Sequence, residues 1–465
     1  MAAPGSSADP VPEATLREVF KAYDVRGLVP EQVDEHLARA VGAAFVTVVG
    51  ATEVVVGHDM RPSSPGLAGA FADGASQAGA DVTMIGLAST DQLYFASGHL
   101  GRPGAMFTAS HNPAQYNGIK LCRAHAQPVG TETGLAEIRD LVAAGHRPTA
   151  AREGSITEHD VLDAYAAHLL SLAPVTGRRL KVVVDAGSGM AGLTAPAVFD
   201  RLGFDAVELD ALYFDLDGSF PHHEANPIDP ANLVDLQRRV VEVGADAGLA
   251  FDGDADRCFV VDERGRAVSP STITALIAAR ELLRVPGATV IHNLITSRAV
   301  PQIVTELGGT PVRTRVGHSY IKARMAETDA VFGGEHSGHF YFRDFWRADS
   351  GMLAALHTLA ALAQTGQPLS GLLGQYERFV ASGEINSTVA DPAAAIAAIA
   401  AAYDGRDGVT TDTLDGLTVS HERWWFNVRA SNTEPLLRLN AEGEDETTMT
   451  GVRDEALAII RGGAA

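Results

Sequence analysis

The feature that most constrains the fold is a pattern that occurs three times along the chain. A β-branched run, a stretch of helical length and a second apolar run follow one another in Glu53–Ile85, Lys181–Leu209 and Thr289–Thr314. Strand, helix and strand in this order form parallel strands joined by a right-handed crossover, with helices on the faces of the sheet. The sequence therefore predicts three related α/β domains with mixed, mostly parallel sheets.

The pattern changes after about residue 376. Alternating runs at Glu384–Val389, Leu417–Ser420 and Trp424–Val428 are separated by an alanine-rich stretch of helical length. Such runs are typical of strands with one buried face, so we expect a C-terminal α+β domain. Polar or turn-forming sequence marks the boundaries, and the predicted domains are 1–150, 151–262, 263–375 and 376–465.

Length and charge narrow the functional classes. The 465 residues fit several domains of about 100 to 200 residues each. Lys and Arg number 36 against 58 Asp and Glu, and the net charge of −22 repels nucleic acid and anionic membranes. Two cysteines are too few for a disulfide framework, and no apolar run reaches the roughly 17 to 25 residues of a membrane-spanning helix. We expect a cytoplasmic monomer or homodimer that binds neither nucleic acid nor membrane.

Two short motifs mimic other enzyme classes. Gly187–Gly192 follows a predicted strand, and Asp210 lies about 20 residues further on, as in a dinucleotide-binding fingerprint. Any strand-to-helix turn favours glycine, so a nicotinamide-dependent oxidoreductase remains only an alternative from another class. Asp215 and Asp217 mimic the Asp-x-Asp of haloacid dehalogenase phosphatases, but the run before them is interrupted by Asp210 and predicts a turn.

The strongest local motif contains three aspartates at alternate positions, Asp252, Asp254 and Asp256, directly after an apolar run. Carboxylate oxygens are hard ligands that suit Mg²⁺. The spacing resembles half of an EF-hand, but Arg257 replaces the required glycine and Cys258–Val261 predicts a strand where a helix would begin. A solvated acidic loop is the structural alternative. A metal site is favoured because the three carboxylates would repel one another without a cation.

Three other loops combine turn residues with polar side chains. Thr108–Pro113 and Asn117–Lys120 contain the turn dipeptides Asn-Pro and Asn-Gly. Gly333–His339 lets the backbone approach a ligand and offers donors and acceptors to sugar hydroxyls. Arg429–Pro435 joins a guanidinium, two hydroxyls and an amide, a set suited to a phosphate. Taken alone, each of these loops would be an ordinary turn.

Together and in this order, the four motifs resemble those of the α-D-phosphohexomutase superfamily, in its bacterial phosphomannomutase/phosphoglucomutase branch. The resemblance extends from about Phe20 and includes Tyr23–Gly27 and Gly57–Ser64. It implies four domains around a central cleft and an isomerase that interconverts hexose 1-phosphate and hexose 6-phosphate. A phosphoserine would donate its phosphoryl group to give a hexose 1,6-bisphosphate, which also serves as activator, and would then take back the other phosphate.

The resemblance also implies residue roles. Ser110 would carry the phosphate and would bind Mg²⁺ together with Asp252, Asp254 and Asp256. The other catalytic residues would be Lys120, Arg257, His339, His111 and Arg26. The phosphosugar substrate would be bound by Tyr23, Gly317, His318, Glu335, Ser337, Arg429, Ser431, Asn432 and Thr433. The positive charge of an otherwise acidic protein would gather in the cleft through Arg26, Arg61, Lys120, Arg257, Lys322 and Arg429.

Two positions depart from this pattern. Ile295 stands where several relatives carry a lysine beside the sugar. The phosphate loop has Asn432 where phosphoglucosamine mutases usually have glycine, so a phosphoglucosamine mutase is the alternative within the class and ranks below mannose and glucose phosphates. A catalytically silent sugar-phosphate-binding protein is a further alternative. The motifs do not separate mannose from glucose.

Overall fold

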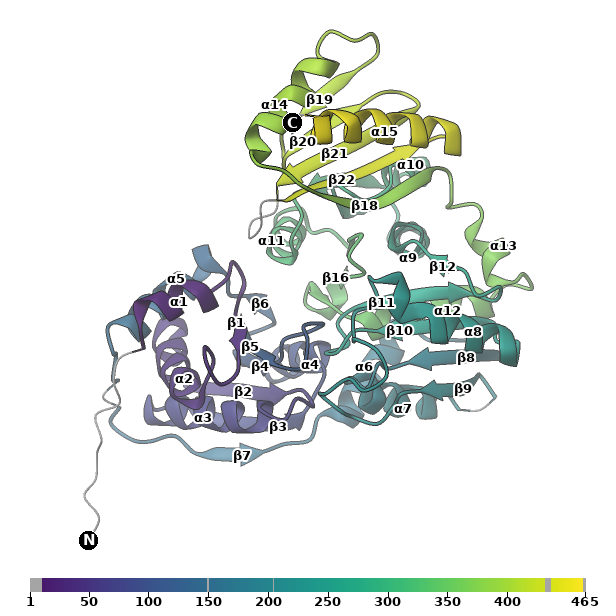
Figure 1. The fold of residues 1–465 in the computed structure, drawn as a ribbon. Coiled ribbons are helices and arrows are strands. Elements are labelled where there is room, and N and C mark those ends of the chain that lie inside the picture. The colour runs from purple at the N-terminus through teal and green to yellow at the C-terminus, as the bar shows by residue number, and fades with distance from the viewer. Residues whose placement is uncertain (1–10, 149, 204, 431–435, 463–465) are drawn as a thin grey trace. The chain divides into compact units, whose positions relative to one another are not determined.

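The computed structural model describes residues 11–148, 150–203, 205–430 and 436–462 (Figure 1). They divide into two compact units. Unit 1 consists of the described residues up to Val268 together with Ser337–Ser370, and unit 2 consists of Ser269–His336 and the described residues from Gly371 onward. Within the described ranges, no helix is both long and apolar enough to cross a membrane.

The first sheet of unit 1 has the strand order β1-β5-β4-β2-β3-β7, with β6 paired to β5. Its strands are β1 (Asp24–Leu28), β2 (Glu53–His58), β3 (Asp81–Leu87), β4 (Gly104–Phe107), β5 (Tyr116–Arg123), β6 (Gln127–Pro128) and β7 (Ile156–Glu158). The accompanying helices are α1 (Glu13–Val19), α2 (Glu35–Val49), α3 (Ser64–Gln77), α4 (Thr90–Leu100) and α5 (Leu135–Ala143). Strands β2, β3 and β4 are parallel, whereas β5 runs antiparallel to β1 and β4.

Helix α2 shows how local sequence sets this architecture. The Asp34 side chain accepts a hydrogen bond from the Leu37 backbone N–H and caps the helix start, and Gly50 ends the helix in a left-handed conformation. Leu37, Val41 and Phe45 recur every four residues and are buried in the core of the first sheet. The apolar stripe therefore fixes which face of the helix the sheet covers.

The second sheet of unit 1 has the order β12-β11-β10-β8-β9. Its strands are β8 (Leu180–Asp185), β9 (Val207–Leu212), β10 (Ala247–Phe251), β11 (Cys258–Asp262) and β12 (Ala267–Val268), and its helices are α6 (Leu162–Leu172), α7 (Ala191–Leu202) and α8 (Val234–Val243). The segment from Ser337 to Ser370 adds β16 (Phe340–Phe342), β17 (Ala348–Asp349) and the buried helix α12 (Gly351–Ala363). The short turn between β10 and β11 carries the three aspartates.

Unit 2 contains a parallel set of strands and an antiparallel sheet. Strand β13 (Thr289–Asn293) pairs in parallel with β14 (Thr310–Thr314) and β15 (Phe332–Gly334), beside helices α9 (Pro270–Arg284), α10 (Ala299–Glu306) and α11 (His318–Thr328). The antiparallel sheet has the order β18-β22-β21-β20-β19. Its elements are β18 (Val380–Thr388), α14 (Pro392–Tyr403), β19 (Thr410–Asp412), β20 (Leu417–Ser420), β21 (Trp424–Ala430), β22 (Leu436–Gly443) and α15 (Glu446–Gly462), and α13 (Leu369–Leu373) precedes them.

The predicted fold class is confirmed. Each of the three predicted strand–helix–strand patterns forms two parallel strands with a helix between them: β2-α3-β3, β8-α7-β9 and β13-α10-β14. The C-terminal alternating runs form antiparallel strands, and the alanine-rich stretch forms α14. Cys258–Asp262 is a strand, which excludes the EF-hand interpretation, and Asp215 and Asp217 follow β9 in an irregular turn.

The glycine motif of residues 187–192 forms the turn between β8 and α7, but protein backbone fills the space beside it. A Cβ atom on Gly189 would lie 2.7 Å from the Gly253 carbonyl oxygen, and one on Gly192 would lie 2.3 Å from the Phe214 carbonyl oxygen. The Asp210 carboxylate pairs with Arg239 at 2.8 Å. These residues serve packing and ion pairing within the protein, and the dinucleotide interpretation loses its support.

Candidate functional site

Several segments of unit 1 that are far apart in the sequence meet at one polar cluster. The turn after β4 carries Ser110, β5 carries Lys120, and the turn between β10 and β11 carries the aspartates and Arg257. Arg257 and His339 also share an isolated antiparallel bridge. Strand ends and tight turns thus bring side chains from three distant stretches of chain into hydrogen-bond distance.

Ser110 lies at the centre of this cluster and is only 4% exposed. Its hydroxyl donates a hydrogen bond to Asp252 Oδ2 at 2.8 Å and accepts one from Arg257 Nη2 at 3.0 Å. The residue has a left-handed backbone with φ of 50°, which is uncommon outside glycine. Such strain persists where the surrounding structure enforces it, and it clusters at functional sites.

The turn around Ser110 is held by a buried ion pair beneath it. Arg61 is 1% exposed and uses all five of its N–H donors within the protein. One bond goes to the Asp59 carboxylate, and the other four go to main-chain carbonyls of Pro113, Tyr116, Ser110 and Asn112. The N–H donors of Arg61 therefore hold the loop that carries Ser110, and its contribution to the positive potential of the cleft stays a prediction.

The carboxylates of Asp252, Asp254 and Asp256 are buried and offer ligand atoms that lie within 4.8 Å of one another. Lys120 Nζ donates to Asp254 Oδ2 at 2.7 Å and to Asp256 Oδ2 at 2.6 Å. The buried Oδ1 atom of Asp254 accepts no hydrogen bond from the described residues, and the buried Oδ1 atom of Asp256 has the His339 imidazole 3.5 Å away. A buried carboxylate oxygen without a donor suits a hard divalent cation, so these residues fit a metal ion.

Burial and mutual repulsion set the protonation of this cluster. Burial raises the pKa of Asp252, and the charges of Asp256 and Asp254 add to the effect while Arg257 opposes it. Burial also acts to raise the pKa of Asp256, but Lys120 and His339 outweigh it and hold that pKa well below the usual range. Burial acts to lower the pKa of Lys120, yet the two carboxylates outweigh it, so the pKa rises and the ammonium stays charged.

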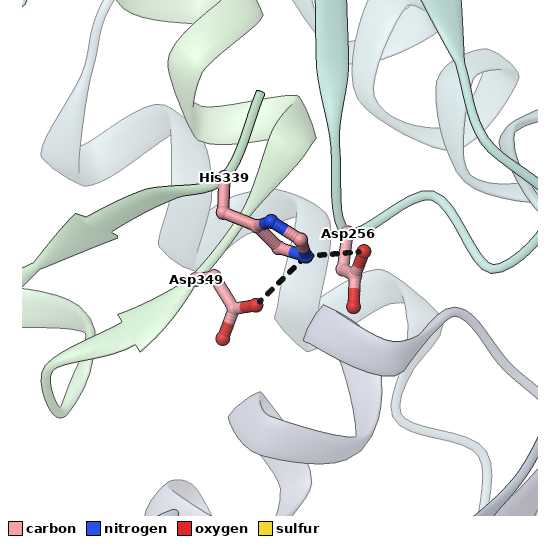
Figure 2. A group of neighbouring side chains, drawn as sticks. All are labelled: Asp256, His339 and Asp349. Atoms are coloured by element: carbon pink, nitrogen blue, oxygen red, sulfur yellow. Dashed lines mark ion pairs between the residues drawn. The ribbon is translucent and has the colours of Figure 1, made fainter. Parts of the chain in front are cut away.

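His339 projects from the segment before β16 toward two carboxylates (Figure 2). Its Nε2 lies 3.5 Å from Asp256 Oδ1 and 4.0 Å from Asp349 Oδ2, and its Nδ1 lies 2.9 Å from the Ser337 hydroxyl. Burial acts to lower the pKa of His339, but Asp256 outweighs this effect and raises it. The imidazole is thus held at both nitrogens and lies beside the aspartate cluster.

The two other predicted catalytic residues contact the serine turn in different ways. His111 Nδ1 lies 3.3 Å from the Ser110 hydroxyl and also contacts Arg257. Burial, then the charges of Arg257 and Arg26, lower the pKa of His111 to about 2, so its imidazole is neutral. Arg26 pairs with Asp24 and donates to Asn112 Oδ1 at 2.7 Å, which ties β1 to the same turn.

The predicted substrate-binding residues fall in both units. Ser337 lies in unit 1 with His339, and Tyr23 is half-buried in the turn before β1. In unit 2, Glu335 is 2% exposed and accepts hydrogen bonds from the Gly317 backbone N–H and from Asn293 Nδ2, each at 3.2 Å. The side chain of His318, and Ser431, Asn432 and Thr433, lie outside what the structure describes.

Arg429 and Ile295 complete the predicted positions in unit 2. Arg429 is the penultimate residue of β21. Its Nη2 donates to Glu384 Oε2 at 3.1 Å, while its buried Nε makes no hydrogen bond to the described residues. Ile295 is 8% exposed and lines a cavity of about 20 Å³ beside Trp425 and Glu442. An apolar side chain therefore lies at this position, and its comparison with a lysine in relatives stays a prediction.

Three contributors to the cluster were not among the predicted site residues. Asp59 belongs to the Gly57–Ser64 motif, so the family resemblance contained a signal for it. Thr90, which donates to Asp254, and Asp349, which lies beside His339, occur in stretches that look like ordinary structural sequence. Only the fold brings these two to the site, and no spacing along the chain indicates them.

Ser110 has a strained backbone, and its hydroxyl contacts Arg257 beside three buried aspartates and Lys120. This arrangement suits a phosphoryl group and a divalent cation. Comparison with known families agrees with this class of site. Phosphoglucomutase/phosphomannomutase models match along the chain: domain I at residues 17–148, domain II at 163–265, domain III at 270–379 and the C-terminal domain at 384–459. The chain therefore belongs to the phosphoglucomutase/phosphomannomutase family, which confirms the resemblance predicted from the four motifs.

Individual relatives match over nearly their whole length. The chain is 41% identical to the phosphohexose mutases of Xanthomonas campestris, over 95% of this chain and 99% of the relative. It is also 41% identical to the phosphomannomutase of Salmonella montevideo, over 94% and 97%. A crystal structure of a phosphoglucomutase/phosphomannomutase family protein from Burkholderia thailandensis matches with a TM-score of 0.87 and 34% identity, over 97% and 99%. The chain is an enzyme of the phosphohexomutase class, an isomerase.

Proposed function

We propose that this enzyme is a phosphomannomutase, with phosphoglucomutase as a second activity, and that it works through a phosphoserine at Ser110. The observation that carries the proposal is the contact of the Ser110 hydroxyl with both Asp252 and Arg257. A hydroxyl between a carboxylate and a guanidinium can carry a phosphoryl group whose charge the arginine and a cation neutralise. The phosphomannomutases among the relatives support the choice of sugar.

In this proposal, the metal is Mg²⁺, held by Asp252, Asp254, Asp256 and a phosphoryl oxygen on Ser110. When bound, the cation would supply charge stabilisation for the transferring phosphoryl group. The buried Oδ1 of Asp254, which accepts no hydrogen bond among the described residues, supports this assignment. A hexose 1,6-bisphosphate would serve as activator and as the released intermediate.

The chain's own residues account for the transfer step. The bond between phosphorus and Ser110 Oγ breaks as a bond to the sugar oxygen forms. The sugar hydroxyl gives up a proton and Ser110 Oγ takes one up, so the serine hydroxyl is restored. Lys120 and Arg257 remain charged and balance the negative charge on the phosphoryl oxygens. Lys120 and His339 are the two candidates for these proton transfers, and both lie beside the carboxylates of the cluster.

The remaining residues would bind the substrate. Glu335, Ser337, Gly317 and His318 would hold the sugar hydroxyls, and Tyr23 would line the same site. The phosphate that does not react would be bound by Arg429, Ser431, Asn432 and Thr433, while His111 and Arg26 would support the serine turn. We further expect a cytoplasmic monomer or homodimer, since the two cysteines are both buried free thiols that fit a reducing compartment.

The test is a coupled assay with mannose 1-phosphate, glucose 1-phosphate and glucosamine 1-phosphate in parallel, with Mg²⁺ and a trace of bisphosphate. We expect turnover of mannose 1-phosphate, a second rate with glucose 1-phosphate, and little with glucosamine 1-phosphate. Preference for glucosamine phosphate would reassign the substrate. If none of the three sugar phosphates were turned over, the chain would instead be a sugar-phosphate-binding protein without mutase activity.

The variant that tests the phosphoserine assignment is Ser110→Ala. It should lower turnover by about three orders of magnitude or more, because the covalent carrier is lost, while sugar-phosphate binding largely persists. Intact mass should show phosphate of about 80 Da on the wild type and none on the variant. Activity of the variant within about tenfold of wild type would contradict the phosphoserine assignment.

A further inference from the structure

Thr90 holds Asp254 at two points. Its hydroxyl donates to Asp254 Oδ2 at 2.6 Å, and its backbone N–H donates to the Asp254 main-chain carbonyl at 3.0 Å. Thr90 is fully buried and is the first residue of α4. Both the side chain and the backbone of one aspartate in the cluster are therefore fixed by a single residue from another part of unit 1.

These contacts leave the two oxygens of the Asp254 carboxylate in different states. Oδ2 accepts from Thr90 and from Lys120, whereas the buried Oδ1 accepts no hydrogen bond from the described residues. Two donors on one oxygen fix the rotation of the carboxylate group and leave the other oxygen for a cation. We propose that Thr90 is a positioning residue that presents Asp254 Oδ1 to the divalent metal, an inference that rests on the proposed function of this cluster.

Thr90 differs from Lys120 in what it can do during turnover. Lys120 is a point charge on a flexible stem, and its proposed role is to follow the negative charge of the phosphoryl group. When it turns toward that group, the Thr90 hydroxyl is the donor that still holds Asp254 Oδ2. A neutral hydroxyl at this position also adds no charge that would repel the cation.

The start of α4 is itself anchored, so Thr90 has little freedom to shift. The Ser89 hydroxyl accepts from the Gln92 backbone N–H and caps the helix. The buried Asp91 carboxylate accepts hydrogen bonds from the Tyr165 hydroxyl at 2.8 Å and from the Ser350 hydroxyl at 2.6 Å. These bonds tie Asp91, the residue next to Thr90, to α6 and to the residue before α12.

The test replaces the hydroxyl with a methyl group of similar volume, Thr90→Val. Binding of Mn²⁺ to the enzyme without substrate is followed by electron paramagnetic resonance, which needs no turnover. We expect the dissociation constant to rise about 10- to 100-fold, as is typical when a partner that orients a metal ligand is lost. Thr90→Ser, which keeps the hydroxyl, should restore most of the affinity. The apparent activation constant for Mg²⁺ should rise in parallel, while kcat at saturating metal changes much less.

The matched control is Thr358→Val in the same unit. Thr358 is also fully buried, but its hydroxyl donates only to the Ala354 carbonyl within α12, so Mn²⁺ affinity should stay at the wild-type value. Thermal melts identify folded variants, and Thr90→Ala replaces Thr90→Val if the latter does not fold. Mn²⁺ affinity within about twofold of wild type in a folded variant that lacks the hydroxyl would overturn the inference. A wild type that binds no Mn²⁺ would instead contradict the proposed function.

Discussion

Two arginines proposed to contact phosphate, Arg257 in unit 1 and Arg429 in unit 2, lie in contrasting surroundings. In unit 1, Ser110 and Asp252 are buried, and the Arg257 side chain that joins them is 3% exposed. In unit 2, the Arg429 side chain is 16% exposed, and it pairs with Glu384, which is 30% exposed. The first set is packed around opposing charges in a low-dielectric interior, whereas the second lies closer to solvent.

This difference indicates separate roles, with phosphoryl transfer in unit 1 and substrate recognition in unit 2. Phosphoryl transfer gains most from charges that are already in position before the reaction, and the buried network of unit 1 provides that arrangement. Substrate recognition needs groups that a ligand can reach, and the Arg429 side chain fits this need because it is partly exposed. Variants in unit 1 should therefore lower kcat, and variants in unit 2 should raise KM.

The strongest effect on this comparison is expected from Asp254→Asn. The change removes one negative charge and one proposed metal ligand, and it puts an amide beside Lys120. We expect Mg²⁺-dependent kcat to fall about 10²- to 10³-fold, with KM for the sugar phosphate nearly unchanged. Steady-state kinetics across a magnesium titration measure both quantities.

The control for this variant is Asp262→Asn. Asp262 is also a buried carboxylate of unit 1, at the end of β11, but it pairs with Arg266 outside the cluster. It should lower stability and leave the magnesium dependence unchanged. If Asp254→Asn gave the wild-type magnesium titration, the three aspartates would have a structural role only.

Arg429→Lys is expected to have a smaller effect, and this effect should fall on KM instead of kcat. Lysine keeps the charge but loses the planar fork that binds a phosphate through two bonds, so KM should rise about tenfold while kcat stays nearly constant. The matched control is Arg438→Lys, because Arg438 lies opposite Arg429 on the neighbouring strand and also pairs with Glu384, at 3.6 Å. Equal changes in KM from both variants would show that the effect comes from the shared glutamate and not from phosphate binding.

Much of the fold was predictable from the sequence because its determinants are local. The parallel pairs β2-β3, β8-β9 and β13-β14 follow from runs of apolar residues separated by a helix-length stretch. The aspartate motif was also visible, since its three ligands are neighbours in the sequence. Features whose determinants lie close together in the sequence can therefore be predicted from the sequence.

The supporting contacts were not predictable because they join distant segments. Thr90 and Asp254 are 164 residues apart, and Asp91 and Ser350 are 259 apart, so no local pattern relates them. Arg61 illustrates a second limit. Its sequence context shows a charge, but only the tertiary structure shows that its N–H groups donate to four main-chain carbonyls around the Ser110 turn.

The smallest predicted effect concerns Asp91, the buried carboxylate next to Thr90 in the first turn of α4. Burial raises its pKa to about 6, against the opposing hydrogen bonds from Ser350, Ser89 and Tyr165. A folded-state pKa above the unfolded one means that the folded protein takes up a proton as pH falls through 6, whereas the unfolded chain stays ionised down to about 4. This group alone should therefore stabilise unit 1 by about 1 kcal/mol between pH 7 and pH 5.

Asp91→Asn removes that gain, so the melting temperature of the wild type should rise by about 2 °C relative to the variant when pH is lowered from 7 to 5. Differential scanning calorimetry at both pH values gives this double difference, in which all other titrating groups cancel. Asp81→Asn is the control: its exposed carboxylate has a lowered pKa because of Arg152, so its contribution is lost only at more acidic pH. A double difference of zero for Asp91→Asn would mean that Asp91 is ionised throughout, and that the hydrogen bonds around α4 compensate for burial without a proton.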